Sequence, residues 1–434
     1  MYRIALVLLT VWMPLGNQQS MAQSLTKPAS AYQAVAEDGA WCWFSDPRAV
    51  YYKGEQERIY YGYINSRGDV MIGARNVKSK AIETYMLHEK LQIDDHNVPA
   101  ILFLPDGKIL TFYTEHNGRF FMRKSKNATD ITSWEEEKVI SFGMGKRRIC
   151  YSHPVMLSGE NNRIYMFFRA QETSDYESWR QYLSYSDDYG NTWSEGQSYL
   201  DTKVATNPIY LKVSSDNKSR VDFVFGAHPK IVASSIHHMY YENGKFYQTN
   251  GNFIAGIKDI PLAVDKINKV YDVTKTNVKS WIWDLALGKD GKPVIAYAQY
   301  PDETDHRYHY TRWNGKKWID EEICKAGGMI TVVPPGKKIL EAHYSGGIVL
   351  DHNNPSEIYL SREINGIFEI EHRVLNGRKW KMNNITTQSK ESNIRPYVVS
   401  NYTGKDAIVM WMNGLYNHYT AFKTVLRINE PADR

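Results

Sequence analysis

The stretch that decides the fold is Ser186-Asp187-Asp188-Tyr189-Gly190-Asn191-Thr192-Trp193. It has the form Ser-x-Asp-x-Gly-x-Thr-Trp, which predicts a tight turn between two β-strands. Asp188 can accept hydrogen bonds from the backbone of its own turn, and Gly190 can adopt a positive φ without a steric penalty. Trp193 then fills the gap to a neighbouring sheet. The stretch therefore predicts a hairpin between outer strands, in a fold where several sheets pack side by side.

Weaker copies of this turn, each with an aromatic residue, recur along the chain. The aromatic residues are Trp134, Trp193, Phe246, Trp318 and Trp380, at spacings of 59, 53, 72 and 62 residues. Such a period indicates a repeat architecture with one supersecondary unit per period. The segments between the turns are short and rich in Val, Ile, Tyr, Phe and Trp, as β-strands are, and none predicts a long amphipathic helix. About 410 mature residues at about 60 per unit predict an all-β fold, a seven-bladed β-propeller rather than a pair of β-sandwiches.

The first residues have the features of an export signal. Arg3 supplies the positive end, Ile4 to Leu15 is apolar, and Ser20-Met21-Ala22 is a small-x-small cleavage site. The apolar run is too short to span a bilayer. We therefore expect a signal peptide over residues 1–22 and a single propeller domain, which carries the catalytic site, over 23–434. The mature protein is expected to be a periplasmic or secreted monomer without membrane attachment.

Charge and cysteine content narrow the choice of partners. The net charge of +5 is mild, with acidic and basic residues well mixed, so it suits an anionic ligand without demanding one. We do not expect an exported propeller to bind nucleic acid, and the run Lys146-Arg147-Arg148 fits a solvated turn. The cysteines Cys42, Cys150 and Cys324 are odd in number and far apart. They predict buried thiols rather than a disulfide framework.

A pair of histidines flanks one predicted hairpin. Asp94-Asp95-His96-Asn97 precedes an apolar strand, His116 follows the next strand, and Pro105-Asp106-Gly107 forms the turn between them. Because two strands joined by a short turn run antiparallel, His96 and His116 are brought to the same end of one blade.

The next two units place other polar residues at the corresponding ends. Tyr151 begins a strand, Arg169 ends the strand after it, and Tyr210 opens a strand one unit later. Arg169 follows three apolar residues, and a buried guanidinium needs a partner. Strand ends of this kind converge on the axis of a propeller. We therefore expect one axial pocket lined by His96, His116, Tyr151, Arg169 and Tyr210, with Asn97 and Arg180 assisting Tyr210 in substrate binding.

Histidine, tyrosine and arginine without a pair of carboxylates suit β-elimination on a uronic acid. The C5 proton of a uronate is weakly acidic, because the neighbouring carboxylate resists a second negative charge. Arg169 and His116 can neutralise that carboxylate and stabilise the developing enolate. Either neutral His96 or ionised Tyr151 can take the proton, and the other can protonate the oxygen that leaves C4. A hydrolase would more often show two carboxylates flanking the bond.

The chain resembles the BNR-4 propellers, which include ulvan lyases of polysaccharide lyase families 24 and 25 and rhamnose-glucuronate lyases of family 42. The resemblance covers nearly the whole mature chain. It implies a seven-bladed propeller and a carbon–oxygen lyase, acting without a catalytic cofactor on an anionic polysaccharide or oligosaccharide. It also implies catalytic or binding roles for His96, His116, Tyr151, Arg169 and Tyr210. The stretches that carry it are Trp41-Cys42-Trp43-Phe44-Ser45-Asp46-Pro47-Arg48-Ala49, Asp94-Asp95-His96-Asn97, Tyr151, Phe168-Arg169, Ala227-His228-Pro229, Tyr344-Ser345-Gly346-Gly347-Ile348-Val349-Leu350-Asp351-His352 and Tyr359-Leu360-Ser361-Arg362-Glu363.

Three other functions stay open. Elimination at a terminal uronate can expel water, which would make the protein an oligosaccharide dehydratase. The similar exo-α-L-rhamnosidases of glycoside hydrolase family 145 work from the opposite face, with a histidine where this chain has Ser45. Serine cannot replace histidine as a base near neutral pH. A non-catalytic glycan-binding propeller is the third alternative, although the intact set of five residues argues against it.

A structural metal ion is a further expectation from the resemblance, because relatives carry calcium or zinc. His228, Cys324, His343 and His352 are conceivable soft ligands. Their spacing matches no diagnostic metal motif. The sequence therefore assigns neither the ion nor its ligands.

Overall fold

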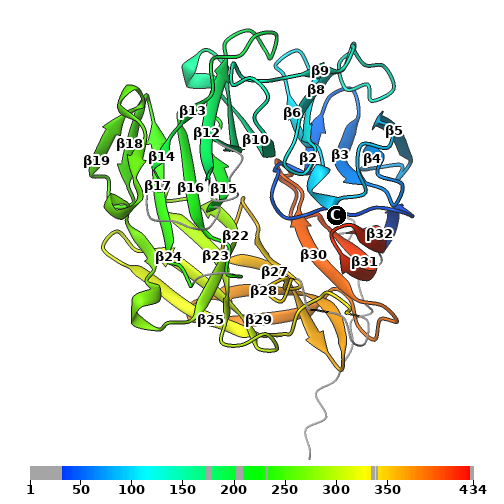
Figure 1. Ribbon diagram of the computed structural model, residues 1–434. Coiled ribbons are helices and arrows are strands. Elements are labelled where there is room, and N and C mark those ends of the chain that lie inside the picture. Colours follow the sequence, from blue (N-terminus) through cyan, green and yellow to red (C-terminus); the bar gives the residue numbers. More distant parts are fainter. Residues whose placement is uncertain are drawn as a thin grey trace, which may run out of the picture.

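The computed structural model describes residues 32–172, 178–201, 209–230, 233–333, 338 and 341–430. Across these residues seven main β-sheets follow one another around a ring, and Figure 1 shows their colours passing from blue to red until the two ends of the chain meet. The first strands of neighbouring sheets contact one another, which makes them the innermost strands. The predicted all-β, seven-bladed propeller is thereby confirmed. The expected signal peptide, residues 1–22, lies outside the described residues.

The first three blades each contain four antiparallel strands in chain order. Blade 1 consists of β2 (Ala49–Lys53), β3 (Glu57–Ile64), β4 (Val70–Asn76) and β5 (Ile82–His88). Blade 2 consists of β6 (Ala100–Phe103), β7 (Ile109–Thr114), β8 (Phe120–Lys124) and β9 (Lys138–Val139). Blade 3 consists of β10 (Ile149–Leu157), β11 (Arg163–Gln171), β12 (Trp179–Ser186) and β13 (Gln197–Ser198).

Blade 4 is larger than the others. It contains β15 (Ile209–Ser215), β16 (Arg220–Ala227), β17 (Ile236–Glu242), β18 (Lys245–Gln248) and β19 (Phe253–Gly256), and β21 (Lys269–Tyr271) pairs with β17. A separate parallel pair, β14 (Leu200–Asp201) with β20 (Leu262–Ala263), links this region to blade 3. The described 3₁₀ turns are η1 (Asp95–Asn97), η2 (Ser158–Glu160), η4 (Ile257–Asp259), η5 (Val264–Lys266) and η6 (Val273–Lys275).

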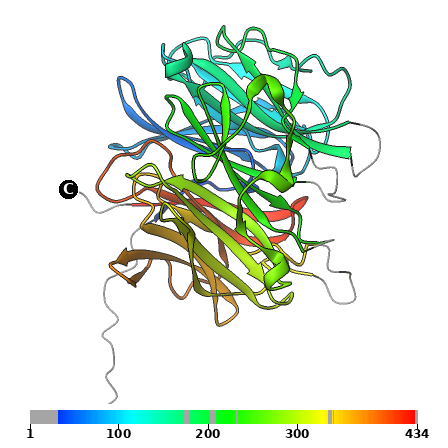
Figure 2. The same ribbon diagram turned by 90° about the vertical axis from the view of Figure 1, so that its left-hand side faces the viewer.

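The last three blades complete and close the ring. Blade 5 consists of β22 (Lys279–Leu287), β23 (Pro293–Tyr300), β24 (His306–Trp313) and β25 (Trp318–Gly327). Blade 6 consists of β26 (Ile348–Leu350), β27 (Glu357–Ile364), β28 (Ile367–Asn376) and β29 (Lys379–Asn384). Blade 7 combines β30 (Asn393–Val398), β31 (Val409–His418) and β32 (Ala421–Asn429) with β1 (Tyr32–Ala36), which pairs antiparallel to β32. Both ends of the chain therefore hold one blade, and the closed ring, seen from its side in Figure 2, buries the inner edge of every sheet.

The turn that suggested the fold joins the third and fourth strands of blade 3. Asp188 accepts the backbone N–H of Thr192 at 2.8 Å, and the Ser186 hydroxyl donates to Asp188 at 2.8 Å. Gly190 has a φ of 83°, and Trp193 packs edge-on against Phe142, with ring centroids 5.5 Å apart. The predicted turn and its tryptophan plug are confirmed. Later aromatic residues of the repeat lie in fourth strands: Phe246 in β18, Trp318 in β25 and Trp380 in β29.

An aromatic segment between β1 and β2 fills the axis. The Trp43 indole stacks on Trp283 with ring centroids 4.6 Å apart, and its Nε1–H donates to the Ile282 carbonyl at 3.2 Å. The Trp41 Nε1–H donates to the Arg395 carbonyl at 3.2 Å, and Phe44 lies 4.9 Å from the Tyr210 ring. Because these partners belong to blades 4, 5 and 7, the segment crosses the centre of the ring. It forms the floor of the axial face.

The expectation of free, buried thiols is confirmed for Cys42 and Cys150, whereas Cys324 is free but only partly buried. In the described part of the chain, no helix has the length and apolar character needed to cross a membrane.

Candidate active site at the axial ends of three blades

Strand pairing brings the predicted site residues together. Ala100 pairs with Phe112 across the β6–β7 hairpin. His96 lies four residues before Ala100 and His116 four residues after Phe112, so both histidines emerge at the same end. In blade 3, Cys150 pairs with Arg169, which places Tyr151 and Arg169 at the matching end. Tyr210 is the second residue of β15, and its ring lies 5.7 Å from Tyr151.

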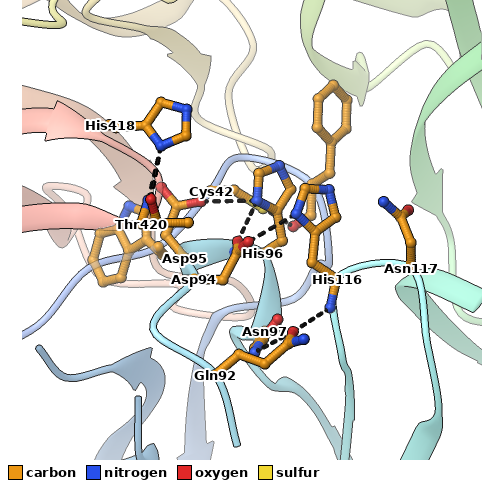
Figure 3. A network of polar contacts seen from close by, with 12 residues as sticks. Cys42, Gln92, Asp94, Asp95, His96, Asn97, His116, Asn117, His418 and Thr420 are labelled. Carbon is orange, nitrogen blue, oxygen red and sulfur yellow. Dashed lines mark hydrogen bonds and ion pairs between the residues drawn. The ribbon is translucent and has the colours of Figure 1, made fainter. Parts of the chain in front are cut away.

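The two histidines form a stacked pair held by one carboxylate (Figure 3). Their rings lie 4.0 Å apart at an interplanar angle of 11°. Asp94 is 2.6 Å from His96 Nδ1 through Oδ1 and 2.8 Å from His116 Nδ1 through Oδ2. Since each Nδ1 faces a carboxylate oxygen, each Nδ1 carries a proton, and each Nε2 is the atom left for chemistry.

The shared carboxylate separates the titration of the two histidines. Burial lowers the pKa of His96, but the Asp94 carboxylate outweighs this effect and leaves that pKa above its usual value. Burial and the neighbouring His96 lower the pKa of His116. Burial alone would raise the pKa of Asp94, yet the two histidines hold it well below its usual range. This arrangement makes His96 the more basic and His116 the less basic of two imidazoles in ring contact, which sets them apart as an acid and a base.

Arg169 lies in an aromatic cage next to this pair. Its guanidinium carbon is 4.9 Å from the Tyr151 ring centroid and 4.7 Å from those of Trp179 and Tyr210. Nη2 makes a long contact of 3.4 Å to Asn117, the residue after His116. Nε and Nη1 are buried without a hydrogen-bond partner among the described residues. Buried charged donors without a protein partner are typical of an anion-binding site.

Tyr151 reaches the pocket through a backbone irregularity. β10 bulges between Cys150 and His153, and Tyr151 adopts a φ of 65°, which is rare for a bulky side chain. A bulge of this kind re-aims a side chain, and such strain is concentrated at functional sites. The Tyr151 hydroxyl is buried without a partner among the described residues. Burial raises the pKa of Tyr151 well above its usual value, so the hydroxyl keeps its proton.

Several neighbours of the site were missed by sequence reasoning. Tyr419, in the β31–β32 turn, packs edge-on against His96 and His116 at 4.8 and 5.3 Å. Asp95, beside Asp94, forms a fully buried ion pair with Arg395 at 2.5 Å and accepts the Tyr416 hydroxyl at 2.6 Å. These contacts join blade 7 to blade 2 and fix η1 in place. They join residues about 300 positions apart in the sequence, so no local sequence pattern predicts them.

The two assisting residues, Asn97 and Arg180, lie outside the pocket. The Asn97 side chain is fully buried and donates to Gln92 at 3.3 Å, and Gln92 in turn accepts the His116 N–H at 2.7 Å. Arg180 follows Trp179 on β12, so the two side chains project from opposite faces of the sheet. Trp179 faces Arg169, whereas Arg180 lies 3.8 Å from Glu172. In this geometry Asn97 supports the histidine pair through Gln92, and a substrate-binding role for Asn97 or Arg180 stays a prediction.

Ser45 lies within the axial segment rather than in an open cleft. It is 2 % exposed, has a φ of 80° and accepts the Ser152 N–H at 3.3 Å. Its hydroxyl therefore serves packing between the segment and β10.

The four conceivable metal ligands do not form one group. His228 and His343 interact electrostatically, whereas His352 contacts Asp284 at 3.1 Å and Cys324 lies in β25. Among the described residues, the one group with donor atoms close enough to hold an ion is Asp94, His96 and His116, within 4.8 Å of one another. Its Nδ1 atoms are already engaged by the Asp94 carboxylate, so the donor set does not fit a resident metal. A structural ion elsewhere stays a prediction.

Comparison with solved structures finds the same fold in two polysaccharide lyases. The chain is similar to the ulvan lyase of polysaccharide lyase family 25, solved bound to -[GlcA(1-4)Rha3S]-, with a TM-score of 0.69 and 14 % identity over 92 % of this chain and 95 % of that one. The polysaccharide lyase Uly1 is similar with a TM-score of 0.58 and 12 % identity, covering 92 % of this chain and 98 % of that one. At these identities the likeness shows the fold alone. Comparison with curated proteins gave no match.

A match to a sequence-family profile shows the family of the chain. The profile of the BNR repeat-containing family, BNR_4, matches residues 58–326, which is more than half of the chain. The matched region runs from β3 to β25 and contains all five residues of the axial group. The chain belongs to the BNR repeat-containing family.

Proposed function

We propose that this protein is a uronate-glycan lyase of the ulvan or rhamnose-glucuronate type, acting in the periplasm or outside the cell. It abstracts the C5 proton of a glucuronate or iduronate and expels the C4 substituent, which leaves a 4,5-unsaturated uronyl product. The observation that carries the proposal is the buried Arg169 guanidinium beside the Tyr151 hydroxyl: Arg169 Nε and Nη1 and the Tyr151 hydroxyl have no hydrogen-bond partner among the described residues.

The substrate carboxylate is proposed to bind Arg169. A carboxylate can accept two parallel hydrogen bonds from a guanidinium, and both ions are then neutralised in a buried place. Charge grows on this carboxylate as the C5–H bond breaks, so the contact strengthens toward the transition state. His96, held by Asp94, adds a second cation on the same side of the pocket when it is protonated.

The histidine pair and Tyr151 divide the proton transfers. Neutral His116 takes the C5 proton on Nε2, because its Nδ1–H is committed to Asp94. Tyr151 donates its proton to the oxygen that leaves C4, since its raised pKa makes an ionised phenolate unfavourable as the base. These proposed roles differ from the expectation drawn from the sequence, because His116 replaces His96 as the candidate base and His96 replaces His116 beside the substrate carboxylate, with Tyr151 as the acid.

Two further points support a lyase over a hydrolase. Both oxygens of Asp94 are occupied by the histidines, so Asp94 is not free to act on a glycosidic bond. The ulvan lyase of similar fold binds a glycan containing glucuronate. A uronate substrate and elimination chemistry are consistent with that likeness and with the buried guanidinium of Arg169.

The test uses ulvan and rhamnose-capped arabinogalactan as substrates, with ultraviolet absorbance for the unsaturated uronate and mass spectrometry for the mass balance. A lyase conserves the total mass of the fragments and produces the absorbance. A dehydratase loses one water without cleaving the chain. Addition of one water across a cleaved bond, without absorbance, would overturn the elimination proposal.

A further inference from the structure

A second polar cluster borders the candidate site on the side of blade 4. It consists of His228, which follows β16, Lys230, and Glu341, which precedes β26. The Glu341 carboxylate lies 3.3 Å from Lys230 Nζ through Oε1 and 3.7 Å from His228 Nε2 through Oε2. Glu341 and His228 are nearly buried, whereas half of Lys230 is exposed. These contacts bridge more than a hundred residues of chain.

The cluster is continuous with the site through Tyr210. The His228 ring lies 5.5 Å from Tyr210, which itself lies against the Arg169 guanidinium at 4.7 Å. From the other side, Glu341 interacts electrostatically with His96 and with Tyr419. The cluster therefore lies next to Tyr210, on the side away from the histidine pair's own blade. A glycan whose carboxylate rests on Arg169 would extend its next sugar unit over Tyr210 toward Glu341.

The tautomer of His228 is set by the backbone. The Lys230 N–H donates to His228 Nδ1 at 3.0 Å, so Nδ1 is unprotonated and Nε2 carries the hydrogen. Burial, together with His343 and Lys230, lowers the pKa of His228 well below its usual value. His228 is therefore a neutral donor, and the charges of Lys230 and Glu341 cancel within the cluster.

Charge cancellation determines what the cluster can bind. A carboxylate accepts hydrogen bonds from sugar hydroxyls, while an ammonium and an imidazole N–H donate to hydroxyl oxygens. A sulfate ester would bring its negative charge next to Glu341, in a place where little water remains to screen it. Repulsion of one substrate is as effective a source of specificity as attraction of another.

We propose that Glu341, Lys230 and His228 form a charge-neutral subsite for the sugar unit next to the uronate, selecting an unsulfated, hydroxyl-bearing unit over a sulfated one. This inference rests on the proposed function for the position of the uronate. Glu341 is the specificity-determining residue, because it supplies the negative charge that a sulfate must approach.

The experiment compares ulvan oligosaccharides that carry sulfate on rhamnose with the same oligosaccharides after chemical desulfation. Specificity is the ratio of kcat/KM for the two substrates, and equilibrium affinities are measured in parallel by calorimetry. The wild type should prefer the desulfated form. Glu341→Gln leaves Lys230 uncompensated and should shift the ratio toward the sulfated form by about tenfold. Lys230→Met should shift it the opposite way, and the double variant should return it toward the wild-type value.

Glu321→Gln is the matched control, since Glu321 is exposed in β25, outside the cluster, and loses the same charge. It should leave the ratio unchanged, and thermal melting checks that all variants fold. If Glu341→Gln changes both substrates equally, the subsite is wrong while the lyase proposal stands. If the wild type yields no unsaturated product from either substrate, the lyase proposal fails. The calorimetric ratio still decides the subsite in that case, and equal affinities in all variants would overturn it.

Discussion

Two buried arginines allow the role of Arg169 to be separated from a role in stability. Arg169 is 3 % exposed and has no carboxylate partner among the described residues, whereas Arg395 is fully buried and paired with Asp95 at 2.5 Å. Replacement of each by methionine keeps the unbranched stem and removes the charge. If Arg169 binds a ligand, its replacement should lower activity more than stability. Replacement of Arg395 should lower stability more than activity.

The magnitudes follow from the contacts. Arg169→Met gives up cation–π contacts to three rings, each worth about 2 kcal/mol at a desolvated site. It also removes two buried N–H donors that lack partners, each of which costs about 1–3 kcal/mol. The two effects largely cancel, so the free energy of unfolding should fall by about 2 kcal/mol. Arg395→Met removes the guanidinium partner of the buried Asp95 carboxylate and leaves it His96 at 3.3 Å and the Tyr416 hydroxyl, which should cost about 3–5 kcal/mol.

Turnover should fall more in Arg169→Met than in Arg395→Met, which is the reverse of the order expected for stability. Loss of one buried electrostatic donor typically lowers turnover about 100- to 1000-fold, which is the expected effect of Arg169→Met. Denaturant unfolding gives the stability change, and initial rates of unsaturated uronate formation give kcat and KM. The reasoning is refuted if Arg169→Met unfolds as easily as Arg395→Met. An unchanged kcat with only a raised KM would show that Arg169 merely binds the substrate.

The remaining predictions concern the other residues of the pocket. His96→Ala should abolish elimination, while Ser45→Ala should stay within a few-fold of wild type; the reverse result in the same rate assay would move the site to the opposite face. Tyr151→Phe keeps the ring but removes the acid, so kcat should fall about 100- to 10,000-fold without loss of stability in thermal melting. The pH–rate profile should be bell-shaped. Its acid limb should lie below the ordinary histidine pKa, because the pKa of the base His116 is lowered, and its alkaline limb above that pKa, because the pKa of His96 is raised. Asp94→Asn removes the charge that raises the pKa of His96, so the alkaline limb should move to lower pH; an unmoved limb would contradict the assigned roles.

Much of the fold followed from local chemistry. The turn around Asp188 is held by contacts within five residues, so neighbouring side chains determine its strand–turn–strand geometry. The placement of His96 and His116 at one end of blade 2 also needed only a hairpin and its register. The repeat period then set the number of blades. Each of these features depends on short-range interactions, which a sequence displays directly.

The state of the site depended on contacts between distant segments. No pattern near His96 and His116 shows that they share Asp94, and the bulge that turns Tyr151 toward Arg169 carries no glycine to mark it. The Lys230–Glu341 contact bridges a separation of 111 residues. Sequence alone therefore determined the propeller and the set of chemical groups at its axis. Only the tertiary structure decided which group is charged and which donors lack partners, because burial and electrostatics depend on every blade that meets at the centre.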